Sequence, residues 1–222
     1  SFLGMIGSAA PATPRLQAPF GVAVAPDGTV YAADASIARI QRFTAAGAFV
    51  GGWGSPGAGN GQFNMPWSVA VAGTGDVYVA DRDNHRIQRF TSSGSFLGAW
   101  GTQGAGTFEL NQPFGVAVAP DGSVYVADAM NNRIQRYTAT GAFMATWGGY
   151  GTAAGRFAAP VAVAVAGDGT VYVADYGNNR VQRFTATGAF ITAWGGAGSS
   201  DGRFTEIVGI AAAADSTVYV ID

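Results

Sequence analysis

A repeat of 47 residues runs through the whole chain and constrains its fold more than any other feature. The motif VYxxD ends at five aspartates, each 47 residues after the last: Asp34, Asp81, Asp128, Asp175 and Asp222. Tryptophans keep the same phase at Trp53, Trp100, Trp147 and Trp194. No insertion interrupts the series, so every period is expected to fold as the same supersecondary unit, packed against its neighbours.

Each period is predicted to contain four short strands. Alternating small and large residues form the first, for example GVAVA at 21–25, and a tight PDGT turn leads into the VYVAD-type second strand. The third strand is of the type RIQRF at 86–90, and a four-residue turn precedes a fourth, such as GAFMATWG at 141–148. We therefore expect an all-β fold, a β-propeller of four-stranded antiparallel blades. A β-solenoid fits less well, because its repeats are shorter and lack three antiparallel hairpins.

The length of the chain is not a whole number of periods. Its 222 residues give four complete blades and leave a fifth incomplete within one domain, 1–222. Residues 1–7 match a fourth strand, so we expect them to complete the blade begun by residues 207–222. This blade would still lack its third strand. Three explanations stay open: a fragment of a longer chain (five-bladed closure, or part of a six-bladed ring), which we favour; a slot filled by another copy or a partner; and an engineered or reduced propeller.

The repeat resembles a known family. ADAMNNRIQRY at 127–137 and ADYGNNRVQRF at 174–184, with a glycine-rich linker before each first strand, are similar to the NHL repeat of β-propellers. The first repeat departs from this pattern at 35–38 (ASIA), and the last departs at 206–217. The resemblance implies a propeller that binds RNA through a basic face, or binds proteins or peptides. Related propellers are amidating lyases or lactonases, which would imply several metal-binding side chains in the channel.

Composition argues against several of these functions. The basic residues are 12 arginines against 14 acidic residues, which is too little positive charge for a nucleic-acid partner. Cysteine is absent, and no apolar run is long enough for membrane insertion. The only histidine is His85, which replaces a loop asparagine, and Glu109 and Glu206 are scattered. We therefore predict no catalytic residue, no metal site and no cofactor.

Each of the first four repeats places an arginine five residues after the aspartate of VYxxD. The two residues flank the loop between adjacent strands, so we predict ion pairs that pin each blade. The alternative is a ring of carboxylates that binds a cation at the channel mouth. The second arginine of each RIQRF strand is expected over a Trp or Phe of the adjoining strand, or in solvent. The predicted structural pairs are Asp34/Arg39, Asp81/Arg86, Asp128/Arg133 and Asp175/Arg180.

Binding residues are expected where the repeats differ, at one face of the ring. Phe20, Trp67 and Phe114 follow the linker prolines and could form an aromatic rim at the channel mouth. Packing between blades is the alternative, and the exposure of Trp67 distinguishes the two. The loops after the second strands add Arg82, Met130 and Tyr176.

The repeats are nearly identical, which argues against a single specialised active site. We therefore expect a non-catalytic binding or structural module, bacterial and extracellular or on the cell surface. Its partners would be proteins or peptides, or other copies of itself through the open fifth blade. A self-assembling subunit and a metal-dependent lyase or lactonase remain the alternatives.

Overall fold

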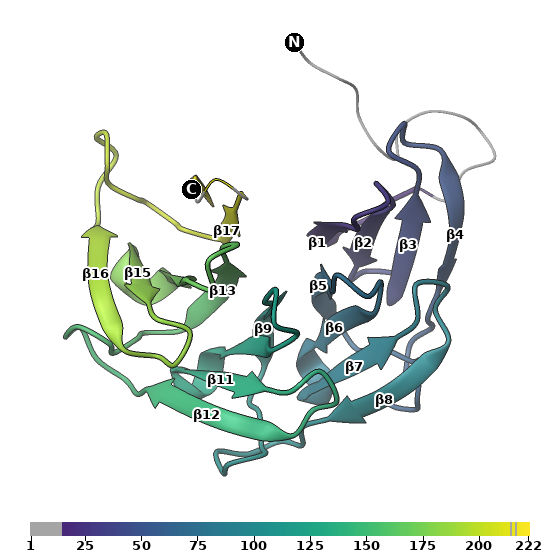
Figure 1. Cartoon of the computed structure of the whole chain (residues 1–222), viewed down its shortest axis with the longest axis horizontal. Helices are drawn as coiled ribbons and strands as arrows, with labels where there is room; N and C mark the ends of the chain where they lie inside the picture. Colours follow the sequence, from purple (N-terminus) through teal and green to yellow (C-terminus); the bar gives the residue numbers. More distant parts are fainter. Residues whose placement is uncertain (1–14, 214, 216) are drawn as a thin grey trace.

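The computed structural model describes residues 15–213, 215 and 217–222. Their strands form four antiparallel sheets of four strands and one sheet of two, arranged around a common axis (Figure 1). Each four-stranded sheet is one blade, and the ribbon is open between β1 and β17. This arrangement confirms the predicted all-β propeller with four complete blades and an incomplete fifth.

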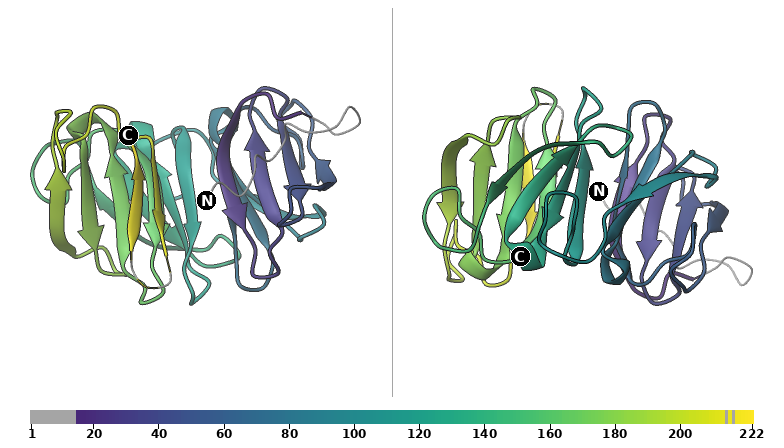
Figure 2. Two further views of the ribbon diagram at one scale, coloured as in Figure 1. Left: turned by 90° about the horizontal axis from the view of Figure 1, so that it is seen from above. Right: turned by 90° about the horizontal axis from the view of Figure 1, so that it is seen from below.

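Strand order within each complete blade follows the chain, and the innermost strands of neighbouring blades lie side by side. Figure 2 shows the ring edge-on, with the strands running across its thickness. The first two blades are β1 (Pro19–Val24), β2 (Val30–Asp34), β3 (Arg39–Phe43), β4 (Phe49–Trp53), then β5 (Pro66–Val71), β6 (Val77–Asp81), β7 (Arg86–Phe90), β8 (Phe96–Trp100). The next two are β9 (Pro113–Val118), β10 (Val124–Asp128), β11 (Arg133–Tyr137), β12 (Phe143–Gly148), then β13 (Pro160–Val165), β14 (Val171–Asp175), β15 (Arg180–Phe184), β16 (Phe190–Gly195). The fifth sheet is β17 (Gly209–Ala212) and β18 (Val218–Ile221).

Short 3-10 turns join the second and third strands in three blades: η1 (Arg82–Asn84), η2 (Ala129–Asn131) and η3 (Tyr176–Asn178). Each ends at a residue in the left-handed conformation, which asparagine tolerates better than most side chains. This explains the second asparagine of the Asn pair, Asn132 and Asn179 in the third and fourth blades. The first blade has Ala38 at the left-handed position instead.

The second strand of each complete blade is buried along its whole length, and in the first three blades its tyrosine joins the blade to the next one. The hydroxyls of Tyr31, Tyr78 and Tyr125 donate to carbonyl oxygens in the turn between the third and fourth strands of the following blade. The fourth strand of each of these three blades carries a tryptophan that packs against an aromatic ring of the following blade. That ring is the last residue of the following blade's third strand, and the centroid distances are 5.5–6.0 Å. We call this tyrosine and tryptophan together the blade latch.

The second arginine of the RIQRF strands has a different partner from the one expected. Arg136 and Arg183 lie over Tyr125 and Tyr172, the residues directly opposite in the ladder, at 5.5 and 5.8 Å. Arg89 instead pairs with Asp76. The expectation of a Trp or Phe was wrong for Arg136 and Arg183, because the second strand carries the tyrosine across from the arginine while the tryptophan contacts the next blade.

The third strand ends in phenylalanine in three of the complete blades, but in the third blade it ends in Tyr137. The Tyr137 hydroxyl is buried without a hydrogen-bond partner among the described residues. We expect Tyr137→Phe to raise the free energy of unfolding by about 1 kcal/mol, because an unsatisfied buried hydroxyl is removed. Burial raises the pKa of Tyr137 above its usual value of 10.0. The unfolded chain therefore ionises first above about pH 10, and the native protein loses stability as the pH rises. Thermal unfolding from neutral pH to about pH 11 should show the variant's advantage widening; a constant or shrinking advantage would contradict this account.

The fifth sheet ends the described chain. The expected closing strand, residues 1–7, lies outside the described residues. Among those that are described, no helix is both long and apolar enough to cross a membrane.

Candidate binding site at the mouth of the central cavity

Three aromatic side chains from successive blades meet at the start of the innermost strands. Phe20 and Trp67 stack with their centroids 3.8 Å apart, and Trp67 meets Phe114 edge-on at 4.9 Å. The Arg82 guanidinium lies over both Trp67 and Phe114, at 4.7 and 5.0 Å from the ring centroids. We call these four residues the aromatic cluster. Pro66 pairs with Asp81 in the ladder, which is why Arg82, one residue on, reaches the ring of Trp67.

Arg82 is held in place by an ion pair. Its Nε donates to Asp83 at 2.8 Å, and the same carboxylate oxygen accepts a hydrogen bond from the Gln112 side chain at 3.3 Å. Gln112 belongs to the linker into the third blade, so this network joins two blades at the mouth. The Arg82 side chain is 19% exposed. The guanidinium is therefore held in one position and remains accessible to solvent.

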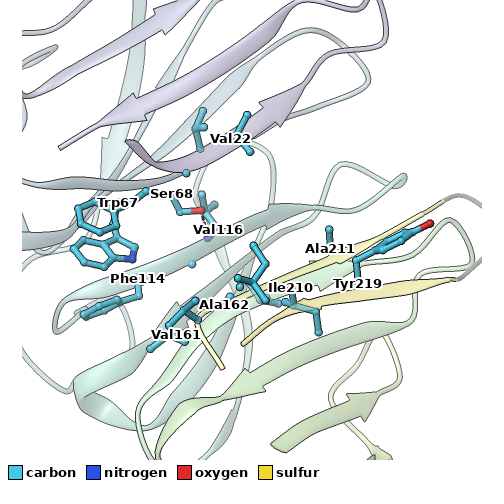
Figure 3. Close-up of a pocket in the computed structure, with 18 residues that line it drawn as sticks. Val22, Trp67, Ser68, Phe114, Val116, Val161, Ala162, Ile210, Ala211 and Tyr219 are labelled. Carbon is cyan, nitrogen blue, oxygen red and sulfur yellow. Dashed lines mark hydrogen bonds between the residues drawn. The ribbon is translucent and has the colours of Figure 1, made fainter. Parts of the chain in front are cut away.

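The cluster borders a cavity of about 270 Å³ on the axis of the ring. Its walls are formed by the innermost strands of all five sheets together with Tyr219 and Ile221 of β18, and most of the lining residues are Val, Ala, Gly or aromatic. Figure 3 shows Trp67 and Phe114 at one end of this wall and Tyr219 of β18 at the other. Phe20 is 52% exposed, whereas Trp67 and Phe114 are half-buried. Trp67 is therefore neither an open rim residue nor a core residue.

The two other predicted loop residues lie away from the cavity wall. Met130 is exposed in η2, and its N–H donates to the Asn111 carbonyl. Tyr176 is exposed in η3, and its hydroxyl donates to Glu206 at 3.2 Å, an interaction that raises the pKa of the phenol. A binding role for these two residues stays a prediction.

The recurring aspartates are the centre of a buried network that we call the aspartate clamp. Oδ2 of Asp128 accepts hydrogen bonds from Arg133 Nε, Asn131 and Gln135, and Oδ1 accepts one from the Asn111 N–H. The Arg133 guanidinium also donates to three carbonyls of the preceding linker, each at 2.8 Å. The clamp thus ties the linker to the blade. The same Asp–Arg ion pair forms in the second and fourth blades, Asp81/Arg86 and Asp175/Arg180.

The first blade corrects this prediction. Asp34 and Arg39 are opposite each other in the ladder but do not form an ion pair; Asp34 accepts instead from two linker N–H groups and from Gln41. Ile37 stands where the other blades have the asparagine of the clamp. The amide that shares Oδ2 with the arginine is therefore absent from this loop, and Arg39 Nε is buried without a partner among the described residues.

The buried aspartates do not point to a shared cation. In the four complete blades they are fully buried, each within its own blade, and burial raises the pKa of Asp81 while its hydrogen bonds act against that rise. In the described part of the chain, no group of three or more His, Cys, Asp or Glu side chains is placed to hold a metal ion.

Comparison with known families identifies the repeat. The NHL repeat family matches residues 63–90, 110–137 and 157–184, which are the first three strands of the second to fourth blades with the linker residues just before them. Three blades of this β-propeller are NHL repeats. The matched ranges of this NHL propeller coincide with the blades in which the complete aspartate clamp forms, and they leave out the first blade.

Solved structures share the fold at low sequence identity. They include virginiamycin B lyase from Staphylococcus aureus (TM-score 0.69, 18% identity, 92% of this chain and 63% of that chain). A streptogramin B lyase is similar (TM-score 0.67, 16% identity, 91% and 61%). So is a nidogen/laminin complex (TM-score 0.66, 15% identity, 92% and 72%). The NHL propeller spans less than two thirds of the length of either lyase, and identity this low shows the fold alone. No curated protein matches the sequence.

His85 of the NHL propeller has a structural place in its loop. Its Nδ1 accepts the Gln112 N–H at 3.1 Å, as Oδ1 of Asn132 accepts the Ala159 N–H one repeat later. This agrees with the interpretation of His85 as a variant of the loop asparagine.

Sequence reasoning missed two other recurring roles, the glutamine of the aspartate clamp and the tyrosine of the blade latch. The glutamine stands two residues after the clamp arginine, so strand periodicity places it on the same face.

Proposed function

We propose that this NHL propeller is a non-catalytic binding module that holds a peptide segment of a partner protein at the aromatic cluster. The observation that supports this most directly is the break in symmetry at the cavity mouth. Positions equivalent to Trp67 carry rings in the first three blades but valines, Val161 and Val208, in the last two. One sector of an otherwise repetitive mouth is therefore chemically distinct.

The cluster has the chemistry of a peptide anchor. Stacked rings offer rigid apolar surface with little side-chain entropy to lose, and aromatic-lined grooves receive extended peptides. Among the described residues only Asp83 accepts a hydrogen bond from the Arg82 side chain. The outer guanidinium nitrogens can therefore donate to peptide carbonyls. The apolar cavity beside them would take an aliphatic or aromatic side chain.

Short random peptides displayed on phage test this proposal. They would be selected on the wild-type protein, with prior removal of those that bind a Trp67→Ala/Phe114→Ala variant. We expect the selected peptides to bind with micromolar Kd in calorimetry, and Trp67→Ala or Arg82→Ala to weaken them at least tenfold. Tyr150→Ala removes an aromatic ring that is 81% exposed and lies outside the cavity wall, so it should change nothing. Failure to enrich any peptide, or equal binding to Trp67→Ala, would refute the proposal.

The likeness to two lyase folds makes an enzyme the second candidate. Incubation of the protein with a streptogramin B, followed by mass spectrometry, separates the two: enzyme-dependent turnover would support the lyase. Loss of that turnover in His85→Asn, which restores the residue typical of the loop, would assign it to this chain.

A further inference from the structure

Four polar side chains at the boundary between the second and third blades stand where the other repeats carry different residues. They are Arg82, Asp83, His85 and Gln112. Hydrogen bonds join them into one chain, because the Arg82 Nε and the Gln112 Nε2 both donate to Oδ1 of Asp83, at 2.8 and 3.3 Å. The Gln112 N–H in turn donates to Nδ1 of His85 at 3.1 Å. We call these four residues the boundary network.

The boundary network is tied to the aromatic cluster at both of its ends. At one end, Arg82 lies over the rings of Trp67 and Phe114. At the other end, Gln112 stands two residues before Phe114, and the residue between them is Pro113, whose ring fixes its backbone φ. A shift of Gln112 relative to the η1 loop therefore displaces Phe114 relative to Trp67.

The contact between loop and linker has a titratable acceptor at this boundary. One repeat later, Oδ1 of Asn132 accepts the Ala159 N–H at 2.8 Å, and an amide oxygen accepts at any pH. His85, the only histidine of the chain, stands at the position equivalent to Asn132 and is half-buried, so protons can reach it from solvent. Imidazole ordinarily changes charge between about pH 5 and pH 8. The contact beside the aromatic cluster is therefore sensitive to pH, and its counterpart is not.

Protonation of His85 takes place at the atom that makes this contact. Because Nδ1 accepts a hydrogen bond, the neutral ring carries its one proton on Nε2. A second proton must bind to Nδ1, which turns that nitrogen from an acceptor into a donor. Two N–H groups would then face each other across the blade boundary, and the linker would move away from the loop.

The other charged groups around His85 are held within their own elements. Those on its loop and at the start of β7 are Arg82, Asp83 and Arg86. Arg86 pairs with Asp81 inside the blade, and Glu109 of the linker accepts the Gly106 N–H. β5, which packs against η1, and β8 and β9, which flank the linker, carry no ionisable side chain. Burial raises the pKa of Asp81, so a test has to separate its titration from that of His85.

We propose that His85 is a pH-sensitive lock on the aromatic cluster. The neutral imidazole holds the linker of the third blade against the η1 loop, and the protonated imidazole lets Phe114 move away from Trp67 and Arg82. Peptide binding would weaken as the pH falls, an effect that rests on the peptide site proposed above. The lock itself is a property of the blade boundary and is measurable without a peptide.

The first experiment uses the protein alone. Its five tryptophans are replaced by 5-fluorotryptophan, and Trp67→Phe identifies the fluorine resonance of Trp67. We expect this resonance to shift in a single step between about pH 7.5 and about pH 5.5. The shift should vanish in His85→Asn, which keeps an acceptor of the kind that Asn132 provides and leaves Asp81 in place. A Trp67 resonance that is constant with pH, or that shifts equally in His85→Asn, would overturn the lock.

A matched control moves the histidine by one repeat. Asn132→His in the His85→Asn background places the only imidazole at the next boundary, where Val161 stands in place of Phe114. The Trp67 resonance should then stay constant with pH. A shift as large as in the wild type would overturn the assignment of the lock to the boundary network.

The second experiment measures the consequence for binding. Peptides selected by phage display at about pH 7.5 are titrated by calorimetry at that pH and at about pH 5.5, and the Kd of the wild type should rise about fivefold or more. In His85→Asn the ratio of the two Kd values should be close to one. A ratio close to one in the wild type would overturn the regulation while leaving the peptide site intact. If no peptide is selected, the proposed function fails, and the fluorine titration still decides whether His85 moves the cluster.

Discussion

Replacing Asp128 by alanine is expected to lower the free energy of unfolding by about 3–5 kcal/mol, because it leaves the Arg133 guanidinium buried without its counter-ion. Arg133 is 15% exposed and Asp128 is fully buried, so solvent screens the pair little. The Asn111 N–H and the side chains of Asn131 and Gln135 lose their acceptor as well. For a chain of this length the melting temperature should fall by about 6–20 °C.

Two matched aspartates separate the contributions. Asp121 pairs with Arg136 at the surface and is 56% exposed, so Asp121→Ala should lower the free energy of unfolding by about 1 kcal/mol or less. Asp34 is buried but has no arginine pair. The loss in free energy of unfolding for Asp34→Ala should therefore lie between the losses for Asp121→Ala and Asp128→Ala. Differential scanning calorimetry of the three variants gives the order. An Asp128→Ala protein with the same melting temperature as the wild type would refute the structural role of the pair.

Gly141→Ala should lower the free energy of unfolding by about 2–5 kcal/mol, since two penalties act together. Gly141 has a φ of +89°, a conformation that is unfavourable for alanine by about 1–2 kcal/mol. Its new Cβ would also lie 2.6 Å from Cε3 of Trp100, and the strain of such overlap adds about 1–3 kcal/mol. The latch between the second and third blades would therefore be forced apart.

Gly122→Ala is the control for this substitution. Gly122 has nearly the same φ, +83°, but the nearest atom to its Cβ would be 4.0 Å away. It should carry the conformational penalty alone, about 1–2 kcal/mol. Denaturant unfolding followed by tryptophan fluorescence measures both variants. Equal losses would show that the Trp100 contact does not contribute.

The fold could be predicted because each of its determinants is local in the sequence. Asp128 and Arg133 flank one short loop, and period-two alternation within VYVAD and RIQRY fixes which side chains face each other. The same reasoning placed Phe20, Trp67, Phe114 and Arg82 at one face, because they differ between repeats at equivalent positions.

Contacts between blades were harder to predict, since they join residues about 60 positions apart through the curvature of the ring. Strand patterns do not show that Tyr125 reaches Ala186 or that Arg82 lies between two rings. The failure of the Asp34/Arg39 pair could not be predicted either, because the motif does not show which groups reach each carboxylate oxygen. Oδ2 of Asp34 accepts the Gln17 N–H, whereas the same oxygen of Asp128 accepts Arg133.

The blade latch has a consequence for how such a chain can change over generations. Every boundary between complete blades uses the same tyrosine, tryptophan and turn glycine, so each repeat encodes both the half-contact it offers and the half-contact it receives. An in-phase duplication or loss of one repeat in the gene would create a boundary that is already complementary. The number of blades can therefore drift in evolution without any compensating substitution at the new junction.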